Sequence, residues 1–293
     1  MTGPGHHRDS APSGLPVGDL PRAGLPTSDI PTPTSALAIG AHPDDIEFGC
    51  GATLAKWAAA GCRVHHLVLT DGSKGSWDPA ADTGELVARR MAECREAAAV
   101  LDGAVEPEGE GAGSAGSDKD LGRENDPDRV LFLGSVDGEL ANGVEERRSV
   151  VAILRRLRPA VVLGHDPWRR YRLHPDHRAA GFLTVDSVVA ARDPHFFPGV
   201  GDGPHRPHTL LLWEADLPDH VEDAEGFEAT KVGALLRHAS QWQSTMGIAG
   251  EGTARSEDPS TDAFGTKVRH QLASHGTLGG FRVGEAFHLM GDL

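Results

Sequence analysis

The stretch LAIGAHPDDIEFGCGATLAKWAAA, residues 37–60, decides the fold of this chain. It starts with the short apolar run Leu37 to Ile39, passes through a polar turn and continues into an apolar segment near Gly51 to Ala60, which Gly61 can end. A strand, a turn and a helix in this order make up the first half of a βαβ unit. The stretch therefore predicts an α/β protein with a parallel sheet.

The same alternation of short apolar runs and amphipathic segments continues downstream. Apolar runs predict further strands at Val64–Leu69, Val130–Leu133, Ala160–Leu163 and Thr209–Trp213, and helical spacing predicts helices at about Glu85–Leu101, Val144–Leu157 and Pro175–Ala191. This order predicts a Rossmann-like three-layer α/β fold with a mostly parallel sheet. In such folds ligands bind at the carboxyl ends of the strands.

Three segments fall outside this pattern. Residues 1–34 are rich in Pro, Gly and Ser, which predicts a disordered N-terminal tail ahead of a single domain over residues 35–293. The stretches 106–128 and 247–262 are Gly-rich and acidic, and we expect both to be mobile surface loops.

Charge and composition exclude several classes of protein. The chain has 28 basic and 43 acidic residues, a net charge of -15, so it lacks the basic stripe that nucleic acids require. The three cysteines have no CxxC spacing, which argues against disulfides and thiolate zinc sites and favours a cytoplasmic location. No stretch reaches the ~20 apolar residues of a membrane span. A homo-oligomer is compatible with the sequence, which carries no signal that decides it.

Two distant runs are built from His, Pro and Asp. The first is Ala-His-Pro-Asp-Asp at residues 41–45, and the second is His-Pro-Asp-His at residues 174–177. Together they offer two imidazoles and one carboxylate to a divalent metal, which leaves one position for water, as in catalytic zinc sites. Either Asp44 or Asp45 can bind the metal while the other takes the proton of the water. Similarly, either His174 or His177 can be a ligand while the other faces a developing oxyanion.

The predicted strands bring these runs to one edge of the sheet. Residues 42–45 follow the first strand, Thr70-Asp71-Gly72 the second, Asp137-Gly138 the third, and residues 165–177 the fourth. Since the carboxyl ends of parallel strands share one edge, the polar clusters are expected to form a single site.

The segments AHPDDIEFGCGATLA and HPDHRAAG resemble the LmbE/PIG-L family of zinc-dependent N-deacetylases. This family includes enzymes that act on N-acetylglucosaminyl-phosphatidylinositol, on the mycothiol and bacillithiol precursors, on diacetylchitobiose and on glycopeptide antibiotics. The resemblance covers most of residues 36–290. It implies an enzyme that removes an acetyl or other acyl group from the nitrogen of an amino sugar or glycoconjugate, with Zn²⁺ as the cofactor or Fe²⁺ in its place.

The resemblance also assigns roles to residues. It implies that the metal ligands are His42, Asp45 and His177, that Asp44 is the general base, and that His174 stabilises the oxyanion and assists departure of the amine. It aligns Arg90 and Asp137 with sugar-contacting positions, although Arg90 with Glu93 is also an ordinary surface pair on a helix.

Two details are left open by the resemblance. The mycothiol-precursor enzymes have a tyrosine two residues before the first histidine of the second motif, where this chain has Arg172, with Tyr171 one residue further back. His238 and Gln241 match a weak His-x-Ser-Gln echo, which helix packing explains equally well.

Three alternatives compete with the deacetylase interpretation. A sugar-binding protein of the same fold could have lost catalysis. A non-haem iron oxygenase also uses two His and one carboxylate, but commonly as His-x-Asp on an all-β barrel. A dinucleotide site would rest on Gly49-x-Gly51, where Leu54 replaces the third glycine of the fingerprint.

Overall fold

The computed structural model describes residues 29–103, 129–249 and 259–293. Much of the predicted tail, the whole predicted loop 106–128 and residues 250–258 of the second predicted loop lie outside these ranges. In chain order the elements are β1 (Ser35–Gly40), α1 (Asp45–Ala59), β2 (Arg63–Thr70), α2 (Thr83–Leu101), β3 (Val130–Ser135), α3 (Val144–Leu157), β4 (Val161–His165), α4 (Pro175–Arg192), β5 (Thr209–Trp213), β6 (His220–Asp223), α5 (Glu228–Leu236), η1 (Ala239–Gln241), η2 (Trp242–Met246), α6 (Pro259–Gly279) and β7 (Gly284–Gly291).

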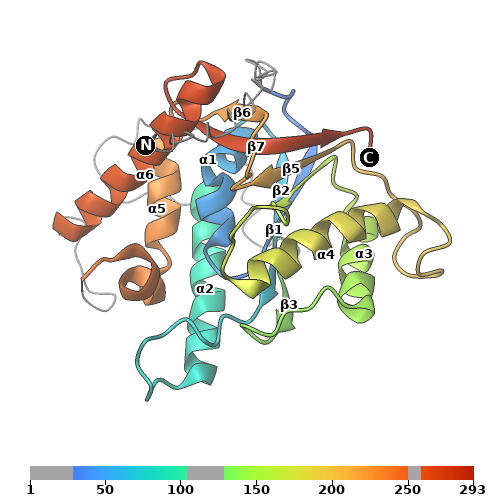
Figure 1. Ribbon diagram of the computed structural model, residues 1–293, viewed down its shortest axis with the longest axis horizontal. Coiled ribbons are helices and arrows are strands. Elements are labelled where there is room, and N and C mark those ends of the chain that lie inside the picture. The colour runs from blue at the N-terminus through green and yellow to red at the C-terminus, as the bar shows by residue number, and fades with distance from the viewer. Residues whose placement is uncertain (1–28, 104–128, 250–258) are drawn as a thin grey trace, which may run out of the picture.

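The strands form a single mixed sheet in the order β3-β2-β1-β4-β5-β7-β6 (Figure 1). The five strands from β3 to β5 pair in parallel, and β7 pairs antiparallel with both β5 and β6. The predicted three-layer, mostly parallel α/β fold is therefore confirmed. β1 and β4 are neighbours whose connections leave in opposite directions, so the crevice between their carboxyl ends is the switch point at which such sheets bind ligands.

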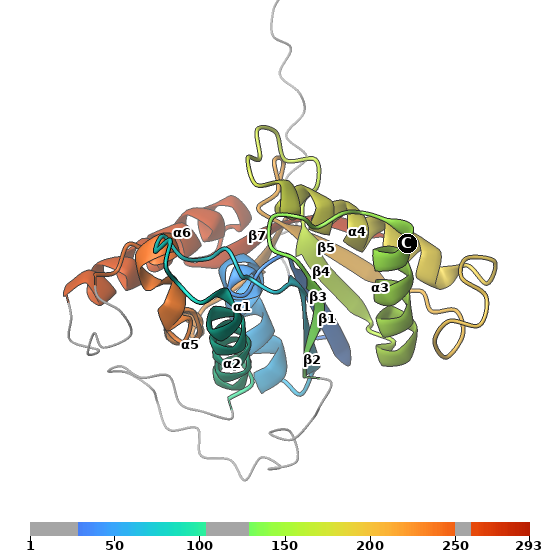
Figure 2. The same cartoon turned by 90° about the horizontal axis from the view of Figure 1, so that it is seen from below.

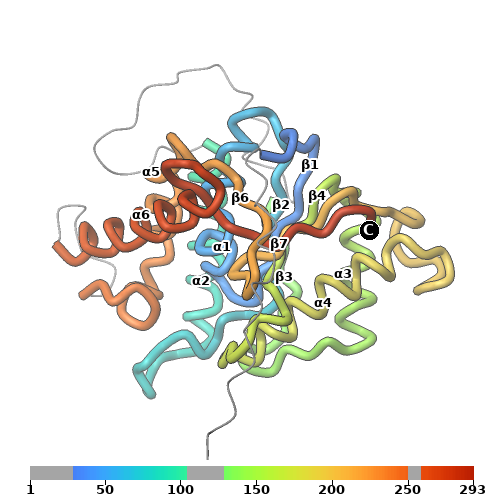
Figure 3. The backbone as a smooth tube through the Cα atoms, turned by 45° about the horizontal axis from the view of Figure 1, so that its top comes forward, coloured from blue at the N-terminus to red at the C-terminus, as the bar shows by residue number. Residues whose placement is uncertain are grey.

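Helices cover both faces of the sheet (Figure 2). Alternate residues of β1 face opposite layers: Ala36 and Ala38 pack with α1 and α2, whereas Leu37 and Ile39 pack with α3 and α4. This period-2 division is expected of strands buried on both sides, which read in sequence as continuous apolar runs. An outer layer of α5, η2 and α6 packs beside α1 (Figure 3).

Helix α1 begins at Asp45, six residues before the predicted start at Gly51, and it is broken at Cys50, where φ is -148°. A buried ion pair, Lys231–Glu285, satisfies the groups that the break exposes. The Glu285 carboxylate accepts the amides of Ala52 and Thr53 at 3.1 and 2.8 Å, and Lys231 Nζ donates to Phe48 O at 2.7 Å and to Glu285 at 2.6 Å. The short first segment of α1, which holds Asp45, is thereby connected to the rest of the helix.

A second buried cation holds the segment after α4. Arg155 of α3 donates to the carbonyl oxygens of Ala190, Ala191, Asp193, Phe196, Phe197 and Val200. Several of these carbonyls belong to the last turn of α4, whose carbonyl oxygens have no hydrogen-bond donor within the helix. The guanidinium supplies the donors that water would otherwise supply.

Several described segments differ from the sequence expectations. Helix α6 begins at Pro259, inside the range 247–262 that was predicted to be a loop. Asp29 and Ile30, inside the predicted tail, contact Lys56 and Glu222, through an ion pair of 3.0 Å and a hydrogen bond of 3.1 Å. Across the described ranges, no helix combines the length and apolar character that crossing a bilayer demands.

Candidate metal-dependent active site

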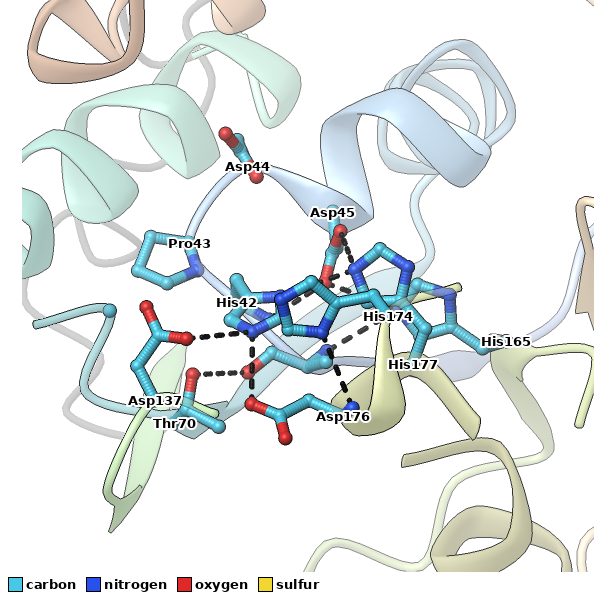
Figure 4. A network of polar contacts seen from close by, with 12 residues as sticks. His42, Pro43, Asp44, Asp45, Thr70, Asp137, His165, His174, Asp176 and His177 are labelled. Carbon is cyan, nitrogen blue, oxygen red and sulfur yellow. Dashed lines mark hydrogen bonds and ion pairs between the residues drawn. The ribbon is translucent and has the colours of Figure 1, made fainter. Parts of the chain in front are cut away.

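The polar side chains predicted to form one site meet at the switch point (Figure 4). The turn after β1 supplies His42, Asp44 and Asp45, and the start of α4 supplies His174 and His177. In this turn the Asp45 carboxylate accepts the His42 amide at 2.7 Å, and Asp44 adopts the left-handed conformation with φ 97°. Since that conformation is strained for a residue other than Gly, the turn is held by its surroundings and turns the two adjacent carboxylates in different directions.

Three of these side chains converge at the spacing of metal ligands. His42 Nδ1 lies 3.2 Å from His177 Nε2 and 3.4 Å from Asp45 Oδ2, and His177 Nε2 lies 3.3 Å from Asp45 Oδ1. Tetrahedral zinc with bonds of ~2.0–2.1 Å has ligand atoms about 3.3 Å apart. The two nitrogens lie at this spacing from each other, and each lies at this spacing from one oxygen of the Asp45 carboxylate, so the set His42, Asp45 and His177 is compatible with three ligands of a tetrahedral ion.

Ring orientation separates this set from the other histidines nearby. The lone pair of an imidazole lies in the ring plane, so two rings can share an ion only where their planes intersect. The planes of His42 and His177 are tilted by 56°. In contrast, His165 and His174 stack on His177 at interplanar angles of 16° and 25°. His174 and His165 do belong to groups of closely spaced potential donors that include His177, namely His42 with His174 and His177, and Asp45 with His165 and His177. Their nearly parallel stacking on His177 makes binding of both rings to one ion less favourable than for His42 and His177.

The other ring nitrogen of His42 faces two carboxylates. His42 Nε2 lies 3.2 Å from Asp137 Oδ1 and 3.1 Å from Asp176 Oδ2, and Asp176 also accepts the amides of Gly138 and Leu140. Burial alone would lower the pKa of His42, but hydrogen bonds to Asp137, Asp176 and Asp45 raise it to about 12. The cluster therefore favours a positive charge at this position. A carboxylate on the outer nitrogen is also the usual support of a metal-binding histidine.

Asp44 is buried beside the ligand set. Burial raises the pKa of its carboxyl from 3.8 to about 6, while the Arg90 guanidinium acts in the opposite direction. Arg90 NH2 lies 3.9 Å from Asp44 Oδ2 and donates to Pro43 O at 2.9 Å, and Arg90 NH1 donates to Gly72 O at 2.8 Å. A carboxylate whose pKa is close to neutrality is suited to take up a proton.

Arg90 is not the surface residue that the alternative interpretation of its helix position described. It is 2% exposed, whereas Glu93 pairs with the neighbouring Arg89. Asp137, which the resemblance aligned with a sugar contact, is buried against His42 and lies 3.9 Å from Arg90. Arg90 thus packs against the turn of Pro43 and Asp44, and Asp137 packs against His42.

His174 caps the N-terminus of α4. Its Nδ1 accepts the amide of Asp176 at 3.3 Å, so the proton of the neutral ring is on Nε2, which is then a hydrogen-bond donor. Burial lowers the pKa of His174, and the neighbouring His42 and His177 lower it further. A neutral donor is therefore available next to the ligand set.

Asp45 is also supported by His165 and Trp213, to which sequence analysis assigned no individual role. His165, at the end of β4, lies with Nε2 3.2 Å from Asp45 Oδ2, and its Nδ1 is 3.0 Å from Trp213 Nε1 and 3.1 Å from Arg172 NH1. Arg172 therefore points inward and pairs with Glu214 at 2.8 Å. Tyr171 is 94% exposed and has φ 57°. Arg172 is 8% exposed, so the position that carries a tyrosine in the family pattern holds a buried guanidinium in this chain.

His238 and Gln241 lie closer to the site than their sequence positions suggested. The buried His238 has Nε2 3.3 Å from Glu47 Oε2, in the first segment of α1, and Gln241 Nε2 donates to Gly75 O at 3.3 Å. His238 thus contacts the helix segment that follows Asp44, and Gln241 contacts the loop whose Gly72 carbonyl accepts from Arg90. The two residues support the site from outside it.

Comparison with known proteins identifies the family. A family model described as PIG-L, GlcNAc-PI de-N-acetylase, matches residues 37–188. The chain belongs to the PIG-L family. The match spans both His-Pro-Asp motifs and ends within α4, so in this PIG-L chain the matched region contains the whole proposed ligand set.

Curated relatives of this PIG-L chain are deacetylases. The diacetylchitobiose deacetylase of Thermococcus kodakarensis is 32% identical over 70% of this chain and 69% of its own length. The 1D-myo-inositol 2-acetamido-2-deoxy-alpha-D-glucopyranoside deacetylase of Rhodococcus erythropolis is 34% identical over 53% of each chain, so this chain spans about half of that relative. Among solved structures, the N,N'-diacetylchitobiose deacetylase of Pyrococcus horikoshii matches with a TM-score of 0.70 and 27% identity, covering 88% of this chain and 84% of that one.

Proposed function

We propose that this protein is a metal-dependent hydrolase that removes an acetyl or other acyl group from the nitrogen of an amino sugar or glycoconjugate. The observation that carries the proposal is the close approach of His42 Nδ1 and His177 Nε2, 3.2 Å apart, each 3.3 to 3.4 Å from one oxygen of the Asp45 carboxylate, next to the buried carboxylate of Asp44. The deacetylase names of the relatives support the same chemistry.

The three ligands would hold Zn²⁺ or another divalent ion such as Fe²⁺. When bound, the ion polarises the amide carbonyl and lowers the pKa of water so that hydroxide is available near neutral pH. The ligand atoms come from the turn after β1 and from the first turns of α1 and α4. His177 is the most exposed of the three side chains, at 24%. The substrate therefore enters on the His177 side.

Asp44 and His174 would move the protons. Asp44 accepts the proton of the attacking water, because its buried carboxyl has a pKa near 6 and lies next to a ligand residue. His174 donates its Nε2–H to the oxyanion of the tetrahedral intermediate. Breaking the C–N bond requires a proton on the leaving nitrogen, which returns from Asp44 with the help of His174. The products are a carboxylate, acetate in the simplest case, and a free amine.

The non-catalytic and oxygenase alternatives make different demands. Oxygenases of this kind commonly carry their site on an all-β barrel, and the observed α/β sheet is a different architecture. The non-catalytic alternative predicts sugar binding without turnover. Acetate release separates it from the proposed enzyme.

The test is acetate release from N-acetylglucosamine, diacetylchitobiose and an N-acetylglucosaminyl-inositol, with bound metal measured in the same samples. Asp44→Asn should retain metal and lose turnover by about 100-fold or more, the usual contribution of positioned acid-base catalysis. Asp262→Asn, on the exposed side of α6, is the matched control and should be unchanged. Unchanged turnover in Asp44→Asn would remove Asp44 as the base, and metal-loaded protein that releases acetate from none of these substrates would favour the non-catalytic alternative.

A further inference from the structure

The carboxylate of Asp45 has a second buried partner besides the proposed metal. His165 ends β4, is 1% exposed and places Nε2 3.2 Å from Asp45 Oδ2. The oxygen it contacts is the one that also accepts the His42 amide at 2.7 Å. Asp45 Oδ2 is thus held from the side that faces away from solvent.

The surroundings of His165 decide which nitrogen carries its proton. Its Nδ1 lies 3.0 Å from Trp213 Nε1 and 3.1 Å from Arg172 NH1. An indole N–H and a guanidinium can only donate, so Nδ1 accepts from them, while the carboxylate oxygen Glu214 Oε2 is farther from this nitrogen, at 3.7 Å. The ring proton is therefore on Nε2 and points at Asp45. The Ala41 amide also points at Nε2, but its 3.4 Å contact is longer than either donor contact at Nδ1.

The donors at Nδ1 are themselves fixed. Trp213 is the last residue of β5, 1% exposed, and its ring meets the His165 ring edge-on with centroids 4.9 Å apart. Arg172 is held by Glu214 at 2.8 Å, and Arg169 also pairs with Glu214, at 3.0 Å. A chain of contacts thus runs from Glu214 through Arg172 and His165 to Asp45.

His165 is better placed as a partner of Asp45 than as a ligand. It does lie within a group of closely spaced potential donors with Asp45 and His177, but its ring is stacked on His177 at 16°, and nearly parallel ring planes disfavour binding of both rings to one ion. A proton on Nε2 also occupies the nitrogen nearest the ligand set. Both features suit a residue that acts through Asp45.

We infer that His165 is a positioning residue that orients the carboxylate of Asp45 for metal binding, in a single tautomer imposed by Trp213 and the Arg172–Glu214 pair. The inference rests on the proposed metal site. It gives Arg172, which departs from the family pattern, a function in the interior of the protein. Outer partners of metal ligands typically contribute 10- to 100-fold to metal affinity.

Two substitutions distinguish the role of Nε2, which faces Asp45, from the role of Nδ1, which faces Trp213. His165→Gln extends an amide to about the position of Nε2 and can still donate to Asp45, whereas His165→Asn ends near Nδ1, where it can accept from Trp213 but cannot reach Asp45. We expect the dissociation constant for Zn²⁺, measured by competition with a chromogenic chelator, to rise about 10- to 100-fold in His165→Asn and less than about 10-fold in His165→Gln.

The control is His220→Gln, which changes a buried histidine paired with Glu222 at 2.7 Å, away from the metal site. Urea unfolding of the metal-free proteins gives the stability of each variant, so that a general loss of packing is separated from a loss of metal affinity. If His165→Asn and His165→Gln weaken Zn²⁺ binding equally, or no more than His220→Gln does, the positioning role is wrong. Loss of stoichiometric metal in both His165 variants would make His165 a ligand and also overturn the inference. Wild-type protein that binds no divalent metal would instead refute the proposed function.

Discussion

The buried pair Lys231–Glu285 offers a sharp test of how the broken helix α1 is stabilised. Lys231→Met keeps the length and apolar stem of the side chain but removes the charge that lies 2.6 Å from Glu285. The Glu285 side chain is 1% exposed, so its carboxylate is left unpaired away from solvent. Removing one partner of a buried ion pair typically costs about 3–5 kcal/mol. At roughly 2–4 °C per kcal/mol, the melting temperature should fall by about 6–20 °C.

A double-mutant cycle shows whether the lost stability belongs to the pair. Glu285→Gln together with Lys231→Met removes both charges and retains an oxygen that can accept the amide of Ala52 or Thr53. The double variant should therefore be more stable than Lys231→Met alone, because no unpaired charge remains. Urea unfolding at equilibrium measures each free energy, and Lys267→Met on the exposed side of α6 controls for the loss of a lysine.

The reasoning would be refuted by a small effect of the single change. A Lys231→Met variant within about 1 kcal/mol of the wild type would mean that the pair contributes no more than an exposed one. An additive cycle would likewise show that Lys231 and Glu285 do not stabilise the helix break together.

Three further predictions concern other parts of the fold. Arg155→Met should destabilise the protein by more than about 3 kcal/mol, because several carbonyls after α4 lose a charged donor; urea unfolding that shows less than 1 kcal/mol would contradict this. Gly49→Ala should cost about 1–3 kcal/mol, since a Cβ there would lie 2.5 Å from the Trp213 ring; an unchanged melting temperature would show that the ring can move away. Removing metal with a chelator should lower the melting temperature, by the equivalent of about 4 kcal/mol if free metal had been present at 1,000 times its Kd, and added Zn²⁺ should restore it. Identical melting curves with and without chelator would argue against a bound metal.

The sequence predicted the parts of the fold that are coded locally. The runs at residues 64–69, 130–133 and 209–213 became strands within two residues of their predicted ends. The first and last are buried strands that read as continuous apolar runs, and the run at 130–133 is apolar although β3 is a half-buried edge strand. The predicted helix 144–157 matches α3 in its bounds. Sequence analysis left β6, α5, β7 and most of α6 unassigned, and it predicted a loop over residues 259–262 of α6. The place of β7 in the sheet depends on its antiparallel pairing with β5 and β6.

The first turn of α1 shows why local signals fail. The apolar pattern predicted a helix start near Gly51, but the chain is helical from Asp45 because Lys231 and Glu285, about 180 and 230 residues away, satisfy its exposed backbone groups. No local pattern reports that contact.

The candidate site divides in the same way. His42, Asp44, Asp45, His174 and His177 stand in two compact motifs, so their convergence could be predicted from the order of strands. His165 stands alone at the end of a strand, with no partner at a characteristic spacing, and its contacts with Trp213 and Arg172 exist only in the folded chain.

The switch point also has a mechanical consequence. His42 and Asp45 lead into the layer of α1, whereas His177 belongs to α4 on the other face of the sheet, 135 residues further along the chain. A divalent ion held by all three residues would link the α1 layer to the α4 layer at the carboxyl ends of β1 and β4. Unlike a disulfide, this link would be lost when the chain unfolds, so it would stabilise the folded protein only by the free energy of ion binding and would make the resistance to unfolding depend on the concentration of free metal.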